Sequence, residues 1–215
     1  MTRNIVVIGT SGFAKEIIFL LKNSYTVDHK QWNIIGCIGE EIDREKKILG
    51  YPVLGNDEYL LNYEDEINVV IGIGNPLIKK RVVEKLKNNP QLLFPNIIAP
   101  TVRMDDSITM GEGNIICDMN ILTTDVTIGN FVTINLSNTV GHDSVIADYV
   151  TINPGCNISG NVEIGQATAI GTGAKIIQKL FIGEESVIGA GSIIIKDVKR
   201  RTTVVGNPGR VIKEW

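Results

Sequence analysis

Residues 146–170 read IADYVTINPGCNISGNVEIGQATAI, and an isoleucine stands at every sixth position of this stretch. The same frame holds an Ile, Val, Leu or Met at seventeen consecutive positions from Ile98 to Ile194. A period of six is neither helical nor a plain strand alternation. It fits a coil of three short strands, in which one apolar residue per strand points inward. The sequence therefore predicts a parallel β-helix with about 18 residues per turn.

The residues around each repeated apolar site support this prediction. A glycine often follows it, as in Ile128-Gly129, Ile164-Gly165 and Ile170-Gly171. An ordinary β-sandwich, the alternative fold, would show apolar runs of variable length and spacing. The frame continues to about Val198, which corresponds to roughly five to six coils.

The first 95 residues have a different pattern. Residues 5–8 form an apolar run typical of a buried strand, and a Gly-rich turn then leads into a helix predicted over residues 13–23. Further strands are predicted at residues 33–38 and 67–74. A second helix is expected after the last of these strands, with Asn75 as its cap and Pro76 at its first position. The expected apolar face of the first helix comprises Ile17, Ile18, Leu20 and Leu21, and that of the second comprises Ile78, Val82 and Leu86.

This β-α-β-α-β unit has features of a nucleotide-binding domain. A Gly-rich turn before a helix presents free backbone N–H groups, which suit a phosphate. Gly74 opens a second helix N-terminus on the same side of the sheet, and Glu40 follows the second strand, where an acid commonly binds ribose or base. From the residues alone, a plain tight turn and a solvated Glu40 explain these features equally well.

The β-helical repeat contains one histidine, His142, directly before Asp143. It is predicted at a corner of the coil, where a side chain points outward and is not needed for packing. A neighbouring carboxylate orients an imidazole and stabilises its cation, as a general base requires. The alternative is a surface histidine without a catalytic role.

Composition excludes several classes of function. A net charge of −3 gives no reason to expect binding to nucleic acid or to an anionic membrane. The apolar run near the N-terminus is too short for a signal peptide or a membrane span. The three cysteines are far apart, and Cys156 falls at an inward position, so neither disulfides nor a metal site is expected and a cytoplasmic location is the default.

Several motifs of the chain resemble those of a known family. The hexapeptide run, Gly141-His142-Asp143-Ser144-Val145-Ile146 and the closing Val205-Gly206-Asn207-Pro208 are similar to left-handed β-helix acyltransferases. With the short α/β unit in front, the chain resembles bacterial nucleotide-sugar N-acetyltransferases of the bacillosamine, viosamine and perosamine pathways, and the related sialic acid O-acetyltransferases. The expected division is 1–95 for nucleotide-sugar binding, 96–198 for the left-handed β-helix and 199–215 for a C-terminal cap.

The resemblance implies the roles of individual residues. His142 would be the catalytic base, Asp143 the acid that orients it, and the N–H of Gly160 would face the thioester oxygen. Acetyl-CoA would pass Thr151, Gly160, Thr172 and Ala190. Some relatives have His at the position of Thr151, and many have two acids where this chain has Gly39-Glu40. The acceptor would contact Asn135, Ser11, Gly12, Phe13, Gly39, Glu40 and Gly74.

The predicted function is transfer of acetyl from acetyl-CoA to the 4-amino group of a UDP-, dTDP- or GDP-linked amino-deoxysugar, for O-antigen, capsule or glycan biosynthesis. The resemblance also implies a homotrimer with sites between neighbouring chains and no metal. A sugar O-acetyltransferase would use the same base and is the alternative. A γ-type carbonic anhydrase needs three histidines for zinc and is excluded. A non-catalytic module would leave the His-Asp pair unexplained.

Overall fold

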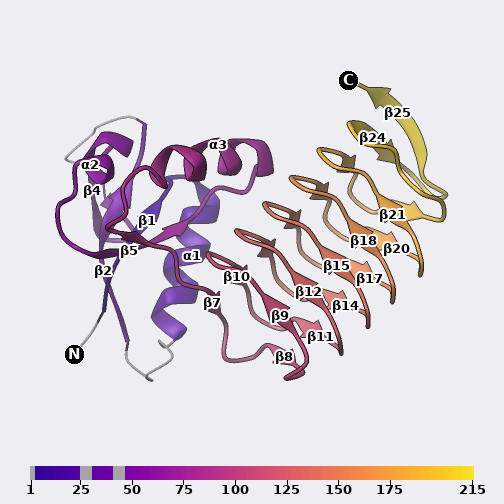
Figure 1. Cartoon of the computed structure of the whole chain (residues 1–215), viewed down its shortest axis with the longest axis horizontal. Helices are drawn as coiled ribbons and strands as arrows, with labels where there is room; N and C mark the ends of the chain where they lie inside the picture. The colour runs from indigo at the N-terminus through magenta and orange to yellow at the C-terminus, as the bar shows by residue number, and fades with distance from the viewer. Residues whose placement is uncertain (1–2, 25–30, 41–46) are drawn as a thin grey trace.

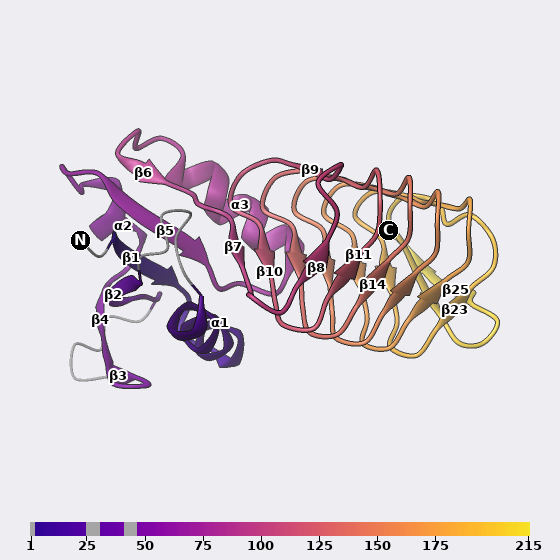
Figure 2. The ribbon, with the colours of Figure 1, turned by 90° about the horizontal axis from the view of Figure 1, so that it is seen from below.

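The computed structural model describes residues 3–24, 31–40 and 47–215. A small α/β unit lies at one end of an elongated three-sided β-helix, and the C-terminus lies at the other end (Figure 1). Seen from below, successive coils of the β-helix stack along one axis away from the α/β unit (Figure 2). The predicted order of the two parts is therefore confirmed.

The α/β unit is built on a six-stranded sheet with the order β3-β4-β2-β1-β5-β6. All neighbouring strands are parallel except β3 and β4. The sequence predicts the central strands but not β3, β4, β6 or the short helix α2. The elements are β1 (Arg3–Ile8), α1 (Gly12–Asn23), β2 (Trp32–Ile38), β3 (Lys47–Ile48), β4 (Tyr51–Gly55), α2 (Asp57–Leu61), β5 (Ile67–Ile71), α3 (Pro76–Leu86) and β6 (Leu92–Leu93).

The two faces of this sheet are covered by different elements. Successive side chains of a strand point to opposite faces. Ile5 and Val7 of β1 pack with α1, whereas Val6 and Ile8 pack with residues of α2 and α3. The predicted apolar face of α1 is confirmed, because all four of its residues are buried.

The predicted apolar face of α3 is confirmed for Leu86, which is buried, and wrong for Ile78. Asn75 caps the helix as expected, since its side chain accepts from the N–H groups of Leu77 and Ile78. However, Ile78 is 45% exposed, and the buried positions include Lys79 and Val83. The helix α3 packs against both the sheet and the β-helix, and the polar contacts of Lys79 with the β-helix help to set the rotation of α3. The apolar pattern of the sequence does not contain these polar contacts, so it does not predict that rotation.

The β-helix consists of three parallel faces whose strands recur every 18 residues. The first face comprises β7 (Ile97–Ile98), β10 (Ile115–Ile116), β13 (Thr133–Ile134), β16 (Thr151–Ile152), β19 (Ala169–Ile170) and β22 (Val187–Ile188). The second comprises β8 (Arg103–Met104), β11 (Ile121–Leu122), β14 (Thr139–Val140), β17 (Asn157–Ile158), β20 (Lys175–Ile176) and β23 (Ile193–Ile194). The third comprises β9 (Thr109–Met110), β12 (Thr127–Ile128), β15 (Val145–Ile146), β18 (Glu163–Ile164) and β21 (Phe181–Ile182).

From β10 to β23, the second residue of each strand forms the core of the coil. Ile134 pairs with Ile152, and Ile158 with Ile176, so identical side chains stack from coil to coil. The predicted period of six is thereby confirmed. We call the turns after the first, second and third faces the first, second and third corners; in the central coils these are residues 135–138, 141–144 and 147–150.

The α/β unit and the β-helix share their hydrophobic cores. The cluster around α1 includes Ile97 and Ile115 of the first face, and the cluster around α3 includes Phe131 and Tyr149 of the third corner. The rings of Phe131 and Tyr149 stack at 5.8 Å between centroids. The two parts are therefore packed firmly against one another.

The C-terminal segment continues the first face. β24 (Thr202–Val205) pairs with β22, and β25 (Arg210–Glu214) folds back antiparallel to β24. Val198 and Val204 close the core at this end. Among the helices that the structure describes, none is long and apolar enough to cross a membrane.

Candidate active site

The second corner carries the His142–Asp143 pair. Nδ1 of His142 lies 2.6 Å from Oδ2 of Asp143, so the carboxylate holds one ring nitrogen and leaves Nε2 for a substrate. Asp143 has a φ of 58°, and Asp125 and Asn161, one coil away on either side, share this left-handed conformation. Asp and Asn tolerate it better than most residues. The geometry of the corner therefore suits an acidic residue directly after the histidine.

Gly160 lies one coil beyond His142 on the same corner. A Cβ atom on this glycine would lie 2.5 Å from Nε2 of His142 and 2.7 Å from its Cε1. The imidazole therefore lies directly against Gly160, where any side chain would displace it. Among the hydrogen bonds of the described residues, none uses the Gly160 N–H. The corner thus combines a base and a free N–H donor, the two groups that acyl transfer to an amine needs.

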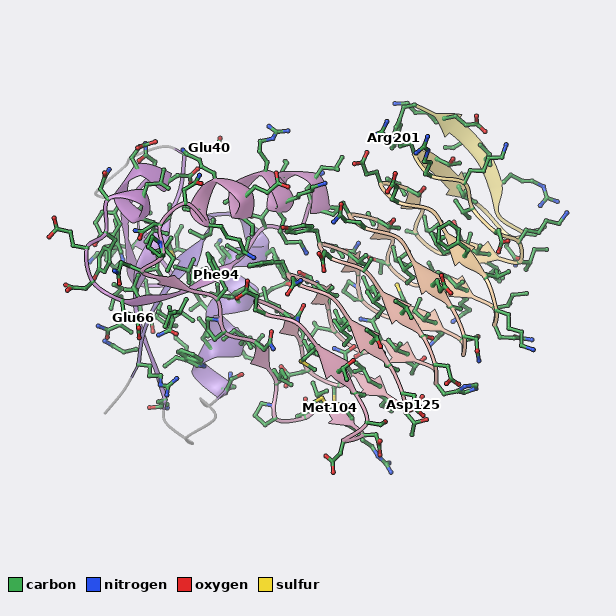
Figure 3. All side chains as sticks on the ribbon, viewed as in Figure 1. Glu40, Glu66, Phe94, Met104, Asp125 and Arg201 are labelled. Carbon is green, nitrogen blue, oxygen red and sulfur yellow. The ribbon has the colours of Figure 1, made fainter. Side chains whose placement is uncertain are left out.

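This corner is open to solvent in a single chain. The side chains of His142 and Asp143 are 60% and 54% exposed. Asp125, one coil before Asp143, marks the same corner at the edge of the β-helix away from α3 and Glu40 (Figure 3). His142 is therefore remote from the α/β unit of its own chain.

A cavity of about 430 Å³ opens at the carboxyl ends of β1, β2 and β5. Ser11, Gly39 and Glu40, three residues predicted to bind the acceptor, line it together. A Cβ atom on Gly39 would lie 2.7 Å from Cγ2 of Thr10, so this position accepts only glycine without rearrangement. Gly9 and Thr10 of the Gly-rich turn, which is expected to suit a phosphate, also line it. Further lining residues have no predicted site role, and these are Ile8, Ile38, Asp57, Ile73, Ile78 and Val82.

Some of these missed residues left a signal in the sequence. Asn56 caps α2 by accepting from the N–H of Glu58, which places Asp57 at the first turn of that helix. An Asn-Asp pair of this kind is a typical helix start. The position of Ile78 explains its exposure, because its side chain lines this cavity instead of packing into the core. Gly12, predicted to contact the acceptor, is exposed at the first turn of α1 but is not among the residues that line this cavity.

A second cavity of about 290 Å³ lies between the α/β unit and the first face. It brings together the predicted residues Phe13, Gly74, Asn135 and Thr151. Thr151, expected on an open edge for acetyl-CoA, is buried here and accepts a hydrogen bond from Nζ of Lys79 at 3.1 Å. The remaining lining residues are Glu16, Thr133, Asn153 and Pro154.

The predicted groups for acetyl-CoA are divided between two corners. Thr172 and Ala190 are exposed on the first corner, on which Asn135 also lies. His142 and Gly160 are on the second corner, and in every coil a strand of the second face separates the two. One chain by itself therefore does not bring His142 and these residues together.

Cys156 lies within a coil of His142 but is not a candidate nucleophile. It is fully buried, and its Sγ donates to the carbonyl of Asn153 at 3.1 Å. Burial raises the pKa of this thiol, which disfavours the reactive thiolate. Within the described part of the chain, His, Cys, Asp and Glu form no group that could hold a metal ion.

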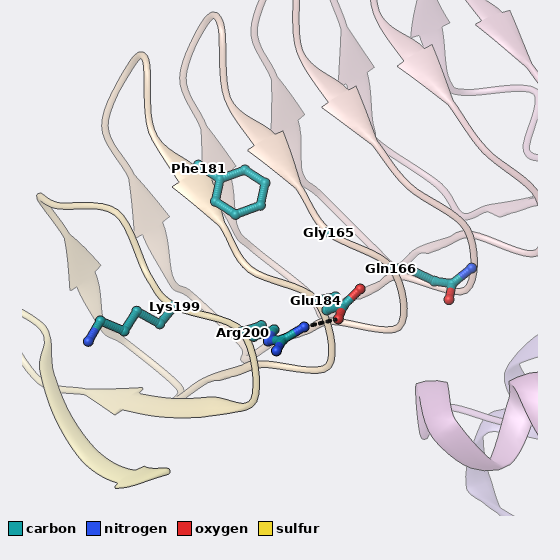
Figure 4. A pocket seen from close by; sticks show the side chains of 6 residues that line it. All are labelled: Gly165, Gln166, Phe181, Glu184, Lys199 and Arg200. Carbon is teal, nitrogen blue, oxygen red and sulfur yellow. Dashed lines mark ion pairs between the residues drawn. The ribbon is translucent and has the colours of Figure 1, made fainter. Parts of the chain in front are cut away.

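A third cavity of about 430 Å³ lies at the third corner near the C-terminus. Phe181 lines it, as do Arg200 and Glu184, which form an ion pair at 3.7 Å (Figure 4). The remaining lining residues are Gly165, Gln166 and Lys199. None of the site residues predicted from the sequence lies in it.

Comparison with known proteins supports the arrangement of both parts. Residues 4–86 match the family described as the PglD N-terminal domain. No curated protein sequence matches the chain. WeeI from Acinetobacter baumannii AYE is 32% identical, with a TM-score of 0.85 over 98% of this chain and 100% of that chain. The acetyltransferase domain of PglB from Neisseria gonorrhoeae, in complex with acetyl coenzyme A, is 26% identical, with a TM-score of 0.88 over 99% and 100%.

A further similar structure is PerB from Caulobacter crescentus, in complex with CoA and GDP-perosamine. It is 23% identical, with a TM-score of 0.86 over 98% of this chain and 97% of that chain. These similarities extend over both parts, so the fold is an α/β unit followed by a left-handed parallel β-helix. The chain belongs to the nucleotide-sugar N-acetyltransferases of the hexapeptide-repeat superfamily, which are acetyl-CoA-dependent enzymes.

Proposed function

We propose that this protein transfers acetyl from acetyl-CoA to the 4-amino group of a nucleotide-linked amino-deoxysugar. The observation that carries the proposal is the second corner, where the His142–Asp143 pair lies against the free N–H of Gly160. Such a corner suits direct attack on a thioester. PerB, which shares the fold, was crystallised with CoA and GDP-perosamine, a nucleotide-linked amino sugar.

In the proposed reaction the neutral amine attacks the thioester carbon while Nε2 of His142 accepts its proton. A carbon–nitrogen bond forms, and the Gly160 N–H donates to the oxyanion that develops on the carbonyl oxygen. The carbon–sulfur bond then breaks, and the CoA thiolate takes up the proton from His142. Asp143 keeps Nδ1 of the imidazole bonded throughout, so Nε2 stays aimed at the acceptor.

The nucleotide end of the acceptor is proposed to occupy the cavity at the carboxyl ends of β1, β2 and β5. Ser11 begins the turn into α1, whose N-terminal N–H groups suit the diphosphate. Glu40 supplies a carboxylate for ribose or base, and Ile73 and Ile78 provide apolar surface. The sugar would then extend toward Asn135 through the cavity between the two parts.

We also propose a homotrimer, because the acetyl-transfer groups lie on two corners of one chain. The second face and the corners beside it expose apolar side chains of Met119, Ile121, Leu136, Ile177 and Ile195. Apolar side chains exposed along one face and its edges suit a surface that another copy of the chain covers. If three second faces surround one axis, the second corner of each chain meets the first corner of the next. Acetyl-CoA would lie in that groove, between Gly160 of one chain and Thr172 and Ala190 of its neighbour.

Because the donor is acetyl-CoA and the acceptor a nucleotide-linked sugar, we assign the reaction to the cytoplasm. The product class suits the biosynthesis of O-antigen, capsule or another glycan.

The test is release of free CoA thiol from acetyl-CoA with a panel of acceptors. The panel contains UDP-, dTDP- and GDP-linked 4-amino sugars and the matching 4-hydroxy sugars. Rapid turnover with one or more 4-amino sugars is expected, with mass spectrometry identifying an amide product. Turnover only with 4-hydroxy sugars would identify an O-acetyltransferase and contradict the proposal.

A further inference from the structure

Lys79 is buried where α3 meets the β-helix. Only 1% of its surface is exposed. Its Nζ donates to Oγ1 of Thr133 at 3.0 Å, to Oγ1 of Thr151 at 3.1 Å and to the carbonyl of Val150 at 3.3 Å. In its protonated form the amine has three hydrogens, and these three acceptors satisfy all of them. A helix of the α/β unit is thereby tied to two successive coils.

A contribution to the stability of the fold does not explain why a lysine is buried at this position. Among the described residues, no carboxylate lies within ion-pair distance of Nζ. Burial lowers the pKa of Lys79 to about 7. An apolar side chain of similar length would fill the same space without the desolvation penalty of a buried amine. What an apolar residue would not provide is a set of directional bonds that hold α3 at one position.

The position of α3 matters because its residues line one cavity and its Lys79 binds side chains that line the other. Ile78 and Val82 line the cavity proposed for the nucleotide. Two of the acceptors of Lys79, Thr133 and Thr151, line the cavity between the two parts, as does Gly74, two residues before α3. The bonds of Lys79 therefore define the distance from the nucleotide end to the first face of the β-helix.

We propose that Lys79 is a positioning residue that sets this distance, so that a nucleotide-linked acceptor presents its amine correctly to the acetyl-transfer groove. The inference rests on the proposed function. A displacement of about 1 Å in a bound substrate can lower its rate by roughly 100-fold. An acceptor without a nucleotide is not held at that end, so its reaction should not depend on Lys79.

The test compares two acceptors, the best nucleotide-linked 4-amino sugar of the panel and the same amino sugar without its nucleotide. Lys79→Met should lower kcat/KM for the nucleotide-linked acceptor by roughly tenfold or more. The value for the free sugar and the KM for acetyl-CoA should stay within about twofold. Thr133→Val should show the same pattern to a smaller extent, and Thr133→Ser, which keeps the hydroxyl, should restore wild-type values.

Lys80→Met is the matched control. Lys80 is the next residue of α3 and also reaches the β-helix, where Nζ donates to Oε1 of Gln166 at 3.0 Å. It should leave both acceptors unaffected. Equal losses of Lys79→Met with the two acceptors, or wild-type activity with both, would overturn the proposal. Failure of the proposed function would be seen in the wild-type protein, which would acetylate neither acceptor, and it would remove the basis of this proposal as well.

Discussion

At the scale of single residues, His142 is the side chain whose loss should affect acetyl transfer most. His142→Asn removes the base but keeps a polar side chain on an exposed corner, so the fold should persist. We expect kcat to fall by roughly 10²–10⁴-fold, the usual effect of losing a general base. Steady-state kinetics and circular dichroism measure the two outcomes. Near-normal turnover of this variant would mean that another group accepts the proton.

Gly160 is expected to be sensitive for a steric reason. In Gly160→Ala, the new methyl group would lie 2.5 Å from Nε2 of His142, so the imidazole would have to move. We expect kcat to fall roughly tenfold or more, with little change in Tm, because His142 is exposed and free to shift. Ser159→Ala, on the same corner, is the control and should behave like the wild type. An unchanged kcat in Gly160→Ala would argue against the position assigned to the thioester.

At the scale of secondary-structure elements, α3 is expected to form one wall of the nucleotide site. Ile78→Asp adds a carboxylate to the cavity that also holds Glu40 and Asp57, where it should repel a diphosphate. The KM for the nucleotide-linked acceptor should rise roughly tenfold, and the KM for acetyl-CoA should not change. Leu77→Asp, one residue earlier on an exposed part of α3, is the control. Equal effects of both variants would contradict the assignment of this cavity.

Lys79 should also make stability depend on pH. Its pKa falls from the ordinary 10.5 to about 7 on folding, so between these values the unfolded chain binds a proton that the folded protein lacks. The stability of the wild type should therefore rise with pH through this window, by at most about 1.4 kcal/mol per pH unit. Lys79→Met lacks this dependence, so any stability advantage of the variant should be greatest below pH 7 and shrink above it. Thermal unfolding at about pH 6.5, 8 and 9.5 measures the difference, and a difference that does not vary with pH would contradict the assignment.

At the scale of the whole molecule, the separation of the proposed acetyl-transfer groups on two corners predicts an assembly. Three chains of 23.5 kDa would form a particle of roughly 70 kDa, which light scattering detects. Ile121→Asp, on the exposed second face, should dissociate this particle and abolish activity, although His142, Asp143 and Gly160 remain in one chain. A fully active monomer would contradict the groove proposed for acetyl-CoA.

A mixing experiment tests whether the site is shared between chains. His142→Asn lacks the base, and Ala190→Trp should block the first corner, so each variant alone should be inactive. Refolding the two in equal amounts should restore about a quarter of the sites. A site works only where the chain that supplies its second corner has an intact His142 and the neighbour that supplies its first corner has an intact Ala190, and this is one of four equally frequent pairings. No recovery would mean that both corners of a functional site belong to the same chain.

The sequence by itself determined the parts of this protein that depend on local spacing. The period of six from Ile98 to Ile194 specifies the coil, because only an inward position at every strand requires an apolar residue so regularly. The Asn75-Pro76 helix start and the adjacency of His142 and Asp143 are equally local. For the same reason the pairing of their side chains at 2.6 Å could be expected from the sequence.

Only the tertiary structure decided how distant segments meet. The apolar pattern of α3 predicts Ile78 as a core residue, yet the helix rotates so that Lys79 reaches Thr133 and Thr151, more than fifty residues away. No local pattern encodes such contacts, because a buried lysine is acceptable only where its acceptors happen to be placed. The same rotation turns Ile78 toward Glu40 and Asp57. Packing between the two parts of the chain, which periodicity does not describe, therefore decided the shape of both cavities.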